Sequence, residues 1–542
     1  MPVPDPPPAY TPTPALGTLP ETGSDLDALP GYTFPSKFSV GGKLTDGPLV
    51  DIRSIKGHLA LLSAFAELKE QVEGKAFDIP YVPEDKEAKW AWFVGMAAER
   101  FDRWCLSLSP SASLQPAENI FPPLDVMMVW HSYMLNPRWY AEDGQRLLAC
   151  KPLLALGEVF GRELHRLPSL LNTPPSEARI TTFSQRVLLP YDPFESARVN
   201  LKKKIKCPRC GVDIVVSCTN AQGTGYLQAG FNAPCPRTDC INVTKESLCA
   251  RKLAETLSRE GEGLECLLPG TLFTGSSTAT QQTSHGIVAH IQAQYILTLQ
   301  TRCVSGINEE LCRKILRDTN FSMPELRAKL PKDKLIGRIL SAHASPMMYS
   351  VDLVGAVLRQ GSFITKMVGL GWTKPRCFDG YEGELVLRHA LARYHAFLDL
   401  LSSAPASFFV PTLDIDLVWH THQLWSPKYE QDCRTHVGRF IDHDDKADGI
   451  KLSSGFDLTS RAWKERFGVR YTYCGCPLPG DTIGQRLSRF VSSATSKSPK
   501  LSKEPGLPSD LVPPPNRSRS RCSHARKRTQ QHSVRCQERY FV

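Results

Sequence analysis

The clearest hydrophobic pattern lies between residues 385 and 401, where apolar side chains recur every three or four positions. The apolar positions are Leu387, Ala390, Leu391, Tyr394, Leu398 and Leu401. Charged residues such as Arg388 and Asp399 fall mostly outside this stripe, which is typical of an amphipathic helix with one face on a core. At Asn136-Pro137 and Ser426-Pro427, a polar residue before proline predicts a helix N-cap followed by the first helical position. We therefore expect a mainly α protein.

A second pattern is an internal repeat of the segments "FPPLDVMMVWHSYMLNPRWYAED" (121–143) and "VPTLDIDLVWHTHQLWSPKYEQD" (410–432). The shared residues are Asp125, Trp130, His131, Leu135, Pro137, Tyr140 and Asp143 in the first copy and Asp414, Trp419, His420, Leu424, Pro427, Tyr429 and Asp432 in the second. The copies are too far apart in the chain for a solenoid array. The repeat predicts two related helical halves that pack together or lie side by side.

The conformation of the second copy decides what its polar side chains can do. These side chains are Asp414, Asp416, His420 and His422. In a strand all four would project from one face and make a good metal site. In a helix only Asp416 and His420, four residues apart, are neighbours. A start signal at Thr412 and the place of Asp414 in a first turn favour the helix.

The repeat also separates two sets of roles. The residues present in both copies are Asp125, Trp130 and His131, matched by Asp414, Trp419 and His420. We interpret them as a structural motif: a carboxylate at the helix start, an aromatic anchor and a hydrogen-bonded histidine. Asp416 and His422 occur only in the second copy, where the first has Met127 and Tyr133. Any added chemistry is therefore expected on Asp416, His420 and His422, although we favour structural use.

A cysteine insert separates the two copies. Cys207, Cys210, Cys235 and Cys240 form a C-x2-C pair, a 24-residue spacer and a C-x4-C pair. Two close pairs can place four thiolates around one tetrahedral zinc ion at about 2.3 Å. The run at 212–216 and the stretch at 223–231 are expected to supply short strands, so the pattern predicts a zinc-ribbon-like β insert. Four thiolates leave no open position on zinc, which indicates a structural site whose module would unfold without metal.

The size and composition of the chain predict more than one domain. It has 542 residues, of which 41% are hydrophobic. A chain of this length is too long for a single core. The predicted parts are a Pro-rich disordered N-terminus (1–48), helical half A (49–200), the cysteine insert (201–262), helical half B (263–484) and a basic disordered tail (485–542).

The net charge of +10 lies in the tail, which holds 13 Lys or Arg against 3 Asp or Glu. A neutral body does not suggest a dedicated duplex-binding domain. Short basic clusters in the tail are compatible with nuclear import or an RNA contact. No apolar stretch is long enough for a membrane helix, and the Pro-rich start lacks the apolar run of a signal peptide. We expect a cytoplasmic protein with no membrane contact, with nuclear entry as the alternative.

The two repeated segments, the stretch at 349–368 and the cysteine insert resemble the glycine-rich domain-containing protein-like family of plants and fungi, over roughly residues 50–480. The resemblance implies no established biochemical activity; plant members are linked to development and stress responses. Fungal members often carry a label as 2-oxoglutarate-dependent sulfonate dioxygenases, which would imply iron and 2-oxoglutarate. The "HTH" at 420–422 is not the H-x-D pair, usually on a strand, that is typical of an iron site, and "HDD" at 443–445 lies in a polar loop.

We therefore favour a non-enzymatic intracellular interaction or regulatory protein with protein partners and a structural zinc ion. One alternative is an iron-dependent oxygenase that uses Asp416, His420 and His422. The other is an RNA-associated protein that acts through its basic tail. A P-loop, a dinucleotide fingerprint and a nucleophile elbow are not evident in the sequence.

Overall fold

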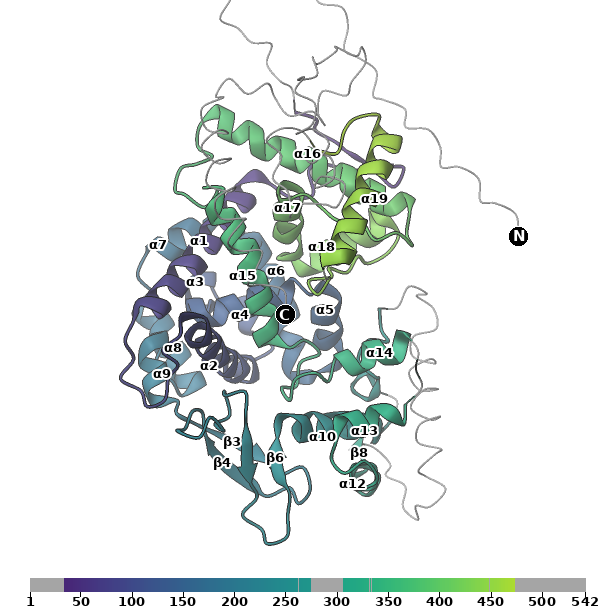
Figure 1. Cartoon of the computed structure of the whole chain (residues 1–542). Helices are drawn as coiled ribbons and strands as arrows, with labels where there is room; N and C mark the ends of the chain where they lie inside the picture. The colour runs from purple at the N-terminus through teal and green to yellow at the C-terminus, as the bar shows by residue number, and fades with distance from the viewer. Residues whose placement is uncertain are drawn as a thin grey trace, which may run out of the picture.

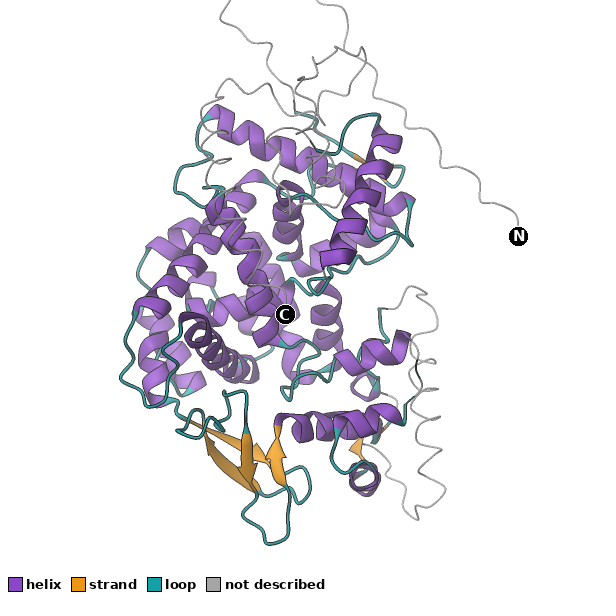
Figure 2. Ribbon diagram, viewed as in Figure 1, coloured by secondary structure: helices purple, strands orange, loops and turns teal. Residues whose placement is uncertain are grey.

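The structure is a computed structural model that describes residues 34–261, 263–273, 306–330, 332, 334–447 and 449–472. Helices dominate these residues, which confirms the predicted mainly α fold class (Figures 1 and 2). The strands form only short antiparallel pairs. The predicted basic tail, and the predicted N-terminal disorder up to residue 33, lie outside the described residues.

The first half begins with a small hairpin, β1 (Ser39–Val40) and β2 (Lys43–Leu44). Its helices are α1 (Ile52–Gly74), α2 (Lys86–Ser107), α3 (Ala117–Ile120), α4 (Leu124–Met134), α5 (Pro137–Arg146), α6 (Lys151–Glu163), α7 (Leu167–Asn172), α8 (Glu177–Val187) and α9 (Pro193–Val199). Short 3-10 turns lie at η1 (Ala112–Leu114), η2 (Leu148–Cys150) and η3 (Leu164–Arg166). Side-chain caps start several of these helices; Asp51, for example, accepts the N–H of Ser54 (2.8 Å) at the start of α1.

The middle of the chain holds the strands β3 (Lys202–Lys206), β4 (Asp213–Ser217), β5 (Asn232–Pro234), β6 (Asn242–Thr244), β7 (Arg259–Glu260) and β8 (Gly306–Ile307). Its helices are α10 (Lys245–Leu257), η4 (Leu264–Cys266), α12 (Glu309–Asp318), α13 (Met323–Ala328) and α14 (Lys334–Ser341). The second half contains α15 (Leu353–Gly369), α16 (Tyr381–Ser403), α17 (Leu413–Gln423), α18 (Ser426–Asp432), the π-helical η5 (Cys433–Val437) and α19 (Gly449–Phe467).

The predicted helices are confirmed at both repeated segments and at residues 385–401. Helix α16 spans the predicted amphipathic stripe and buries Leu387, Leu391 and Leu398. Helices α4 and α17 hold the two copies. At the second proline signal the prediction is wrong by one residue, because Trp425 is the N-cap and Ser426 is already helical.

The two predicted halves share a single hydrophobic core. It contains residues of both repeated helices, such as Trp130 of α4 and Val418 of α17. Helix α15, from the second half, packs against α1, α2 and α4 of the first (Figure 1). Its buried residues, among them Val357 and Met367, belong to the same core. The halves therefore interlock, and neither is a closed unit.

Part of the predicted N-terminal disorder is a folded hairpin. Strands β1 and β2 pair at residues 39–44, and the N–H of Gly41 donates to Asp399 on α16 (2.9 Å). Gly41 has a φ of +60°, and a Cβ there would lie 2.1 Å from the carbonyl oxygen of His436. The hairpin is held by contacts with residues far along the chain, which composition does not reveal.

The cysteine insert has its own small core, and a second core forms next to it. The insert core includes Ile205 and Val243. Helices α10 and α12 to α14 enclose the second core, which includes Leu253 and Ile339. The sequence divided these helices between the insert and half B.

One predicted strand of the insert is wrong. Strand β4 (Asp213–Ser217) covers all but the first residue of the predicted run at 212–216, but residues 223–231 form mostly turns and bends. The side chain of Gln228 accepts the N–H groups of Asn220 (3.1 Å) and Gly225 (2.7 Å). Because side chains satisfy these backbone groups, the segment needs no ladder partner.

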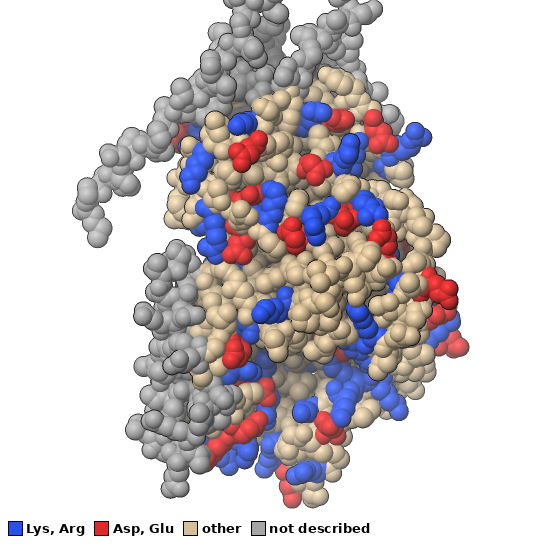
Figure 3. Space-filling model, turned by 180° about the vertical axis from the view of Figure 1, so that it is seen from behind, with Lys and Arg blue, Asp and Glu red and all other residues tan. Residues whose placement is uncertain are grey.

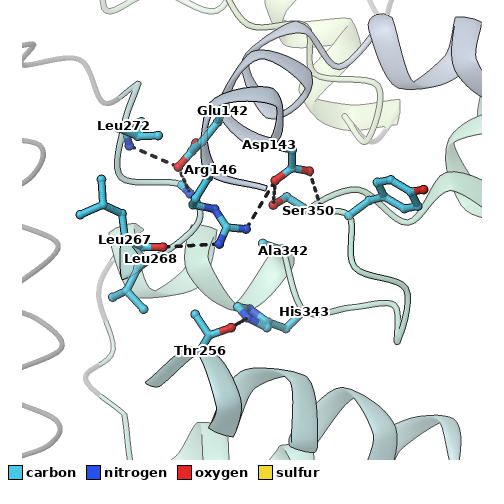
Figure 4. Close-up of polar contacts among 12 residues, drawn as sticks. Glu142, Asp143, Arg146, Thr256, Leu267, Leu268, Leu272, Ala342, His343 and Ser350 are labelled. Atoms are coloured by element: carbon cyan, nitrogen blue, oxygen red, sulfur yellow. Dashed lines mark hydrogen bonds and ion pairs between the residues drawn. The ribbon is translucent and has the colours of Figure 1, made fainter. Parts of the chain in front are cut away.

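A buried polar cluster ties α5 to the middle of the chain (Figure 4). Glu142 accepts the backbone N–H groups of Gly270 (2.7 Å), Thr271 (3.1 Å) and Leu272 (3.3 Å). Asp143 accepts the N–H (2.7 Å) and the hydroxyl (2.5 Å) of Ser350. These bonds fix the segments that follow Leu268 and α14 of the second core to α5.

Candidate metal centres

The four cysteines of the insert converge on one point. The Sγ atoms of Cys207 and Cys240 are 3.6 Å apart, and those of Cys210 and Cys235 are 3.5 Å apart. All four thiols lie within 4.8 Å of one another. Tetrahedral zinc thiolates with bonds of about 2.3 Å have sulfurs about 3.8 Å apart. The predicted cysteine set therefore has the spacing to hold a metal ion.

Two turns position these thiols: one joins β3 to β4, and the other, with Cys235 and Cys240, joins β5 to β6. Cys207 and Cys210 lie on the turn between β3 and β4, where Gly211 adopts a φ of +73°. Burial raises the pKa of Cys207 to about 12, whereas the N–H of Val212 lowers the pKa of Cys210 to about 7. The group thus includes one thiol that ionises readily near neutral pH.

A second candidate centre lies on α17. The residues are Asp416, His420 and His443. The Nε2 atom of His420 lies 3.1 Å from Nε2 of His443 and 3.3 Å from Oδ1 of Asp416. The third separation, from His443 Nε2 to Asp416 Oδ1, is 3.9 Å. Two imidazole nitrogens and one carboxylate oxygen therefore point at a common position.

Two elements supply this trio. Asp416 and His420 are neighbours one turn apart, as the helical prediction for this segment requires. His443 comes from the segment after η5, which is fastened where Ile441 accepts the hydroxyl of Tyr429 (3.2 Å). The edge of its ring contacts the ring of Trp419, with centroids 5.3 Å apart.

The other two side chains of the predicted Asp and His cluster, Asp414 and His422, point elsewhere. Asp414 pairs with the buried Arg393 (2.9 Å). His422 Nε2 donates to Asp432 (3.1 Å), and its Nδ1 accepts the hydroxyl of Tyr394 (2.9 Å). The trio expected for an iron site is therefore wrong in one member: His422 lies two residues, or about 200° around the helix, from His420.

The first copy contains a counterpart of the contact between His422 and Asp432. The counterpart of His422, Tyr133, donates its hydroxyl to Asp143 (2.6 Å), the counterpart of Asp432. The same side-chain bond thus links equivalent positions in both copies. His422 thus occupies the position of Tyr133, and each of the two side chains donates one hydrogen bond to the aspartate ten residues further on.

The residues interpreted as a structural motif make matching contacts in both copies. Asp125 pairs with the buried Arg100, as Asp414 does with Arg393. The indole N–H donates to a tyrosine hydroxyl from Trp130 to Tyr140 (3.1 Å) and from Trp419 to Tyr429 (2.8 Å). These pairs fix the start and the end of each repeated helix.

The two motif histidines differ in their surroundings. His131 Nε2 lies 3.0 Å from Nε2 of His58, on α1. The Thr421 hydroxyl donates to the Leu417 carbonyl (2.7 Å), so it accepts the Nδ1–H of His58 (2.9 Å). His58 Nε2 then carries no proton and accepts from His131. Burial holds the pKa of His131 at about 3, so this pair stays neutral.

The trio on α17 borders a cavity of about 630 Å³. Its wall includes Phe363, Lys366, Arg359, Arg138 and Arg439. Burial would raise the pKa of Asp416, but His420, His443 and Lys366 outweigh it and lower the pKa. Burial and the neighbouring His420 lower the pKa of His443. The centre therefore combines an ionised carboxylate with a neutral His443 imidazole.

Sequence reasoning identified Asp416 and His420 as neighbours but missed His443. Residues 443–445 read H-D-D, which has the H-x-D spacing, but they follow no predicted element. The only signal was a histidine beside two aspartates in a polar segment, and such a signal does not show which distant side chains it meets. Within the described residues, the four cysteines and the trio of Asp416, His420 and His443 are the two clusters with metal-ligand spacing.

The fold and these clusters define a mainly helical protein with two candidate metal centres. Residues 300–432 match the glycine-rich domain-containing protein-like family, which confirms the predicted resemblance for this segment. The match contains α17 but ends before His443, and it does not include the cysteine insert.

Two curated relatives from Arabidopsis thaliana are similar to part of the chain. Glycine-rich domain-containing protein 2 is 37% identical over 139 residues, which are 24% of this chain and 16% of the relative. Glycine-rich domain-containing protein 1 is 34% identical over 157 residues, or 27% and 18% of the two chains. The chain thus matches less than a fifth of each relative's length. No solved structure matches the chain. Among the described helices, none has the length and apolar character needed to cross a membrane.

Proposed function

We propose that this chain is a zinc-stabilised interaction protein, in which a closed four-cysteine zinc site holds a β-hairpin module against a helical body. One observation carries the proposal: four thiols, from Cys207, Cys210, Cys235 and Cys240, face one another at tetrahedral spacing. A zinc ion held by four thiolates has no position for substrate, so this module would have a structural role.

The outer face of the hairpin offers a surface for a partner. In the β3–β4 register, Lys204 lies opposite Val215 and Lys202 opposite Ser217, and all four are exposed. Val215 is 64% exposed, and Lys206 continues the lysine row opposite Asp213, which pairs with Lys204 (2.7 Å). Figure 3 shows Lys and Arg side chains at the lower end of the molecule, where the insert lies. A basic face around an apolar residue suits an acidic protein surface.

The inner face of the hairpin holds it to the body. Lys203 turns inward and forms an ion pair with Glu99 of α2. Thr219 donates to the carbonyl of Pro80 (3.0 Å), and the Lys245 ammonium lies 3.1 Å from the ring centre of Tyr226. These contacts would present the outer face as a rigid platform once zinc fixes the turns.

The proposed location is the cytoplasm, with nuclear import through the basic tail as the alternative. The four clustered cysteines and their neighbours Cys218 and Cys249 are free thiols. Free thiols and a thiolate zinc site suit a reducing compartment. An RNA role of the tail concerns residues outside those described; it would appear as salt-sensitive binding that is lost when the chain is truncated near residue 485.

We also propose that the two copies arose by an internal duplication, because their contacts match. The ion pair, the indole hydrogen bond and the bond to the final aspartate recur at equivalent positions. Duplication followed by divergence of Met127 and Asp416 is the simplest account.

Cobalt substitution of the full chain tests the zinc site. Thiolate ligands give Co²⁺ an intense charge-transfer absorption, which we expect in the wild type and not in Cys207→Ser/Cys210→Ser. Cys218→Ser is the matched control, because Cys218 is a buried thiol of the same module outside the cluster. Absence of the band from the wild type, or its persistence in the double variant, would contradict the proposal.

Charge reversal tests the interaction surface. Lys202→Glu/Lys204→Glu/Lys206→Glu should weaken binding of a polyglutamate peptide at least about tenfold while the cobalt spectrum is unchanged. Truncation at residue 485 should leave that binding intact. If only the truncation reduces binding, the tail is the interaction site and the hairpin is not.

A further inference from the structure

We propose that Asp416, His420 and His443 bind a divalent transition-metal ion whose remaining coordination positions open to the cavity beside α17. This second centre goes beyond the proposed interaction role and is independent of the cysteine site. It is the type of site in which three protein ligands leave room for water or a small ligand.

The donor atoms have the separations that such an ion needs. Ligand bonds of about 2.1 Å place neighbouring donors about 3.0 Å apart in octahedral geometry and about 3.4 Å apart in tetrahedral geometry. The observed separations from His420 Nε2 are 3.1 and 3.3 Å, to His443 and Asp416. The third, 3.9 Å, closes if the ring of His443 shifts by a few tenths of an ångström. Two imidazoles and one carboxylate suit zinc, iron and related divalent ions.

Without a cation, this arrangement leaves polar atoms unsatisfied. Two imidazole nitrogens that face each other can bond only if one carries a proton, because two lone pairs repel. Asp416 Oδ1, beside them, lies 3.3 Å from His420 Nε2 but makes no well-aligned hydrogen bond in the described part of the chain. A cation at the shared position would satisfy both lone pairs and the carboxylate together.

The first copy provides an internal comparison. His131 meets His58 in a similar Nε2–Nε2 contact, but Met127 replaces the aspartate. There the Thr421 hydroxyl fixes the proton of His58, so the pair forms a complete hydrogen bond without a cation. In the trio no such group fixes the proton: His420 Nδ1 and His443 Nδ1 both lack a partner among the described residues, whereas in the first pair only His131 Nδ1 does.

The surroundings leave one side of the centre open. The trio lies in the wall of a cavity of about 630 Å³, large enough for a small molecule. The buried Nε–H groups of Arg138 and Arg439, also in that wall, find no acceptor within the described residues. Water or a small anion in the cavity would reach both the ion and these donors.

Cobalt binding by the full chain tests the centre separately from the cysteine site. We expect two Co²⁺ ions per wild-type chain, of which only one shows thiolate charge transfer. Cys207→Ser/Cys210→Ser should retain one ion that lacks this band. Azide should change the spectrum of this retained ion, because an open position can accept an exogenous ligand.

Variants of the trio should remove only the second ion. His443→Ala and Asp416→Asn should each bind a single, thiolate-bound Co²⁺, and near-ultraviolet circular dichroism would confirm that both are folded. His131→Gln, which removes one histidine of the other imidazole pair, should still bind two ions. The proposal is overturned if the wild type binds only the thiolate-bound ion, or if both trio variants keep two.

Discussion

Each copy of the repeated helix begins with a buried aspartate that faces a buried arginine. In the second copy, Arg393 contacts Asp414 (2.9 Å), donates to the hydroxyl of Thr412 (2.9 Å) and to the carbonyl of Tyr471 (3.0 Å). The arginine therefore holds the N-cap residue, whose own side chain makes no capping bond to α17. Arg393 therefore fixes the start of α17 against the segment that follows α19, in which Tyr471 lies.

Replacement of one partner of this pair should be costly. Arg393→Met leaves the carboxylate of Asp414 buried without its cation, and we expect the free energy of unfolding to fall by about 3–5 kcal/mol. Arg393→Met/Asp414→Leu should recover most of that loss, because it removes both charges. Urea denaturation of both variants measures this. A double variant no more stable than the single one would contradict the explanation.

His395 gives the fold a predictable response to acid. Its Nδ1 donates to the carbonyl of Leu391 (2.8 Å), and its Nε2 accepts the N–H of Leu49 (3.1 Å). Burial lowers its pKa to about 3, whereas the unfolded chain has a histidine pKa of about 6.5. Between these values the unfolded state binds the proton. This contribution to stability is therefore complete above about pH 6.5 and is lost as the pH falls toward 3.

The effect can be isolated with His395→Gln, which keeps an acceptor for Leu49 but does not titrate. Below about pH 6.5 the unfolding free energy of the wild type should fall more steeply than that of the variant, by about 1.4 kcal/mol per pH unit. Denaturant titrations at several pH values between about 7.5 and 5 measure the difference. Parallel curves for the two proteins would show that His395 does not carry this dependence.

At the scale of elements, residue spacing was sufficient to predict the helices, but it did not predict which other segments of the chain contact them. The four-residue interval between Asp416 and His420 places both on one face whatever the rest of the fold, so their contact was predictable. His443 reaches them only because the chain turns back through η5 and is held at Ile441 by Tyr429. No local pattern encodes that return. The hairpin at residues 39–44 was missed for the same reason.

Close contact between elements also depends on single glycines. Gly57 lies on α1 where this helix meets η3, and a Cβ there would lie 1.8 Å from the carbonyl oxygen of Leu164. Gly57→Ala should therefore lower the free energy of unfolding by about 1–3 kcal/mol. Thermal denaturation measures the change.

Gly361→Ala, on α15, is the matched control because nothing lies within 4 Å of its added Cβ. Both changes improve helix propensity equally, so the control variant should be more stable than the wild type by about 0.5–1 kcal/mol. Equal melting temperatures for the two variants would mean that α1 and η3 can separate without cost.

On the scale of the whole molecule, the repeat does not produce two independent domains. Helix α15 covers α1, α2 and α4, and residues of both halves share one core. The sequence predicted two halves from their similarity, but similarity says nothing about how the copies bury each other's surfaces.

A fragment limited to residues 49–200 should therefore fail to fold cooperatively. It would expose the faces of α2 and α4 that α15 covers, which removes part of the apolar burial that drives folding. The fragment should show helical far-ultraviolet but weak near-ultraviolet circular dichroism, with a broad thermal transition. The chain truncated at residue 472 is the control and should melt sharply. A sharp transition in the fragment would show that the first half is a domain of its own.

The central claim is that the chain holds two metal ions in two different kinds of site, one lined by four thiols and one by two imidazoles and a carboxylate. Crystals grown with zinc would test it most directly through an anomalous difference map at the zinc absorption edge. We predict one peak among Cys207, Cys210, Cys235 and Cys240, a second among Asp416, His420 and His443, and none between His58 and His131. A map without density at the trio, or with an equal peak between His58 and His131, would contradict the account.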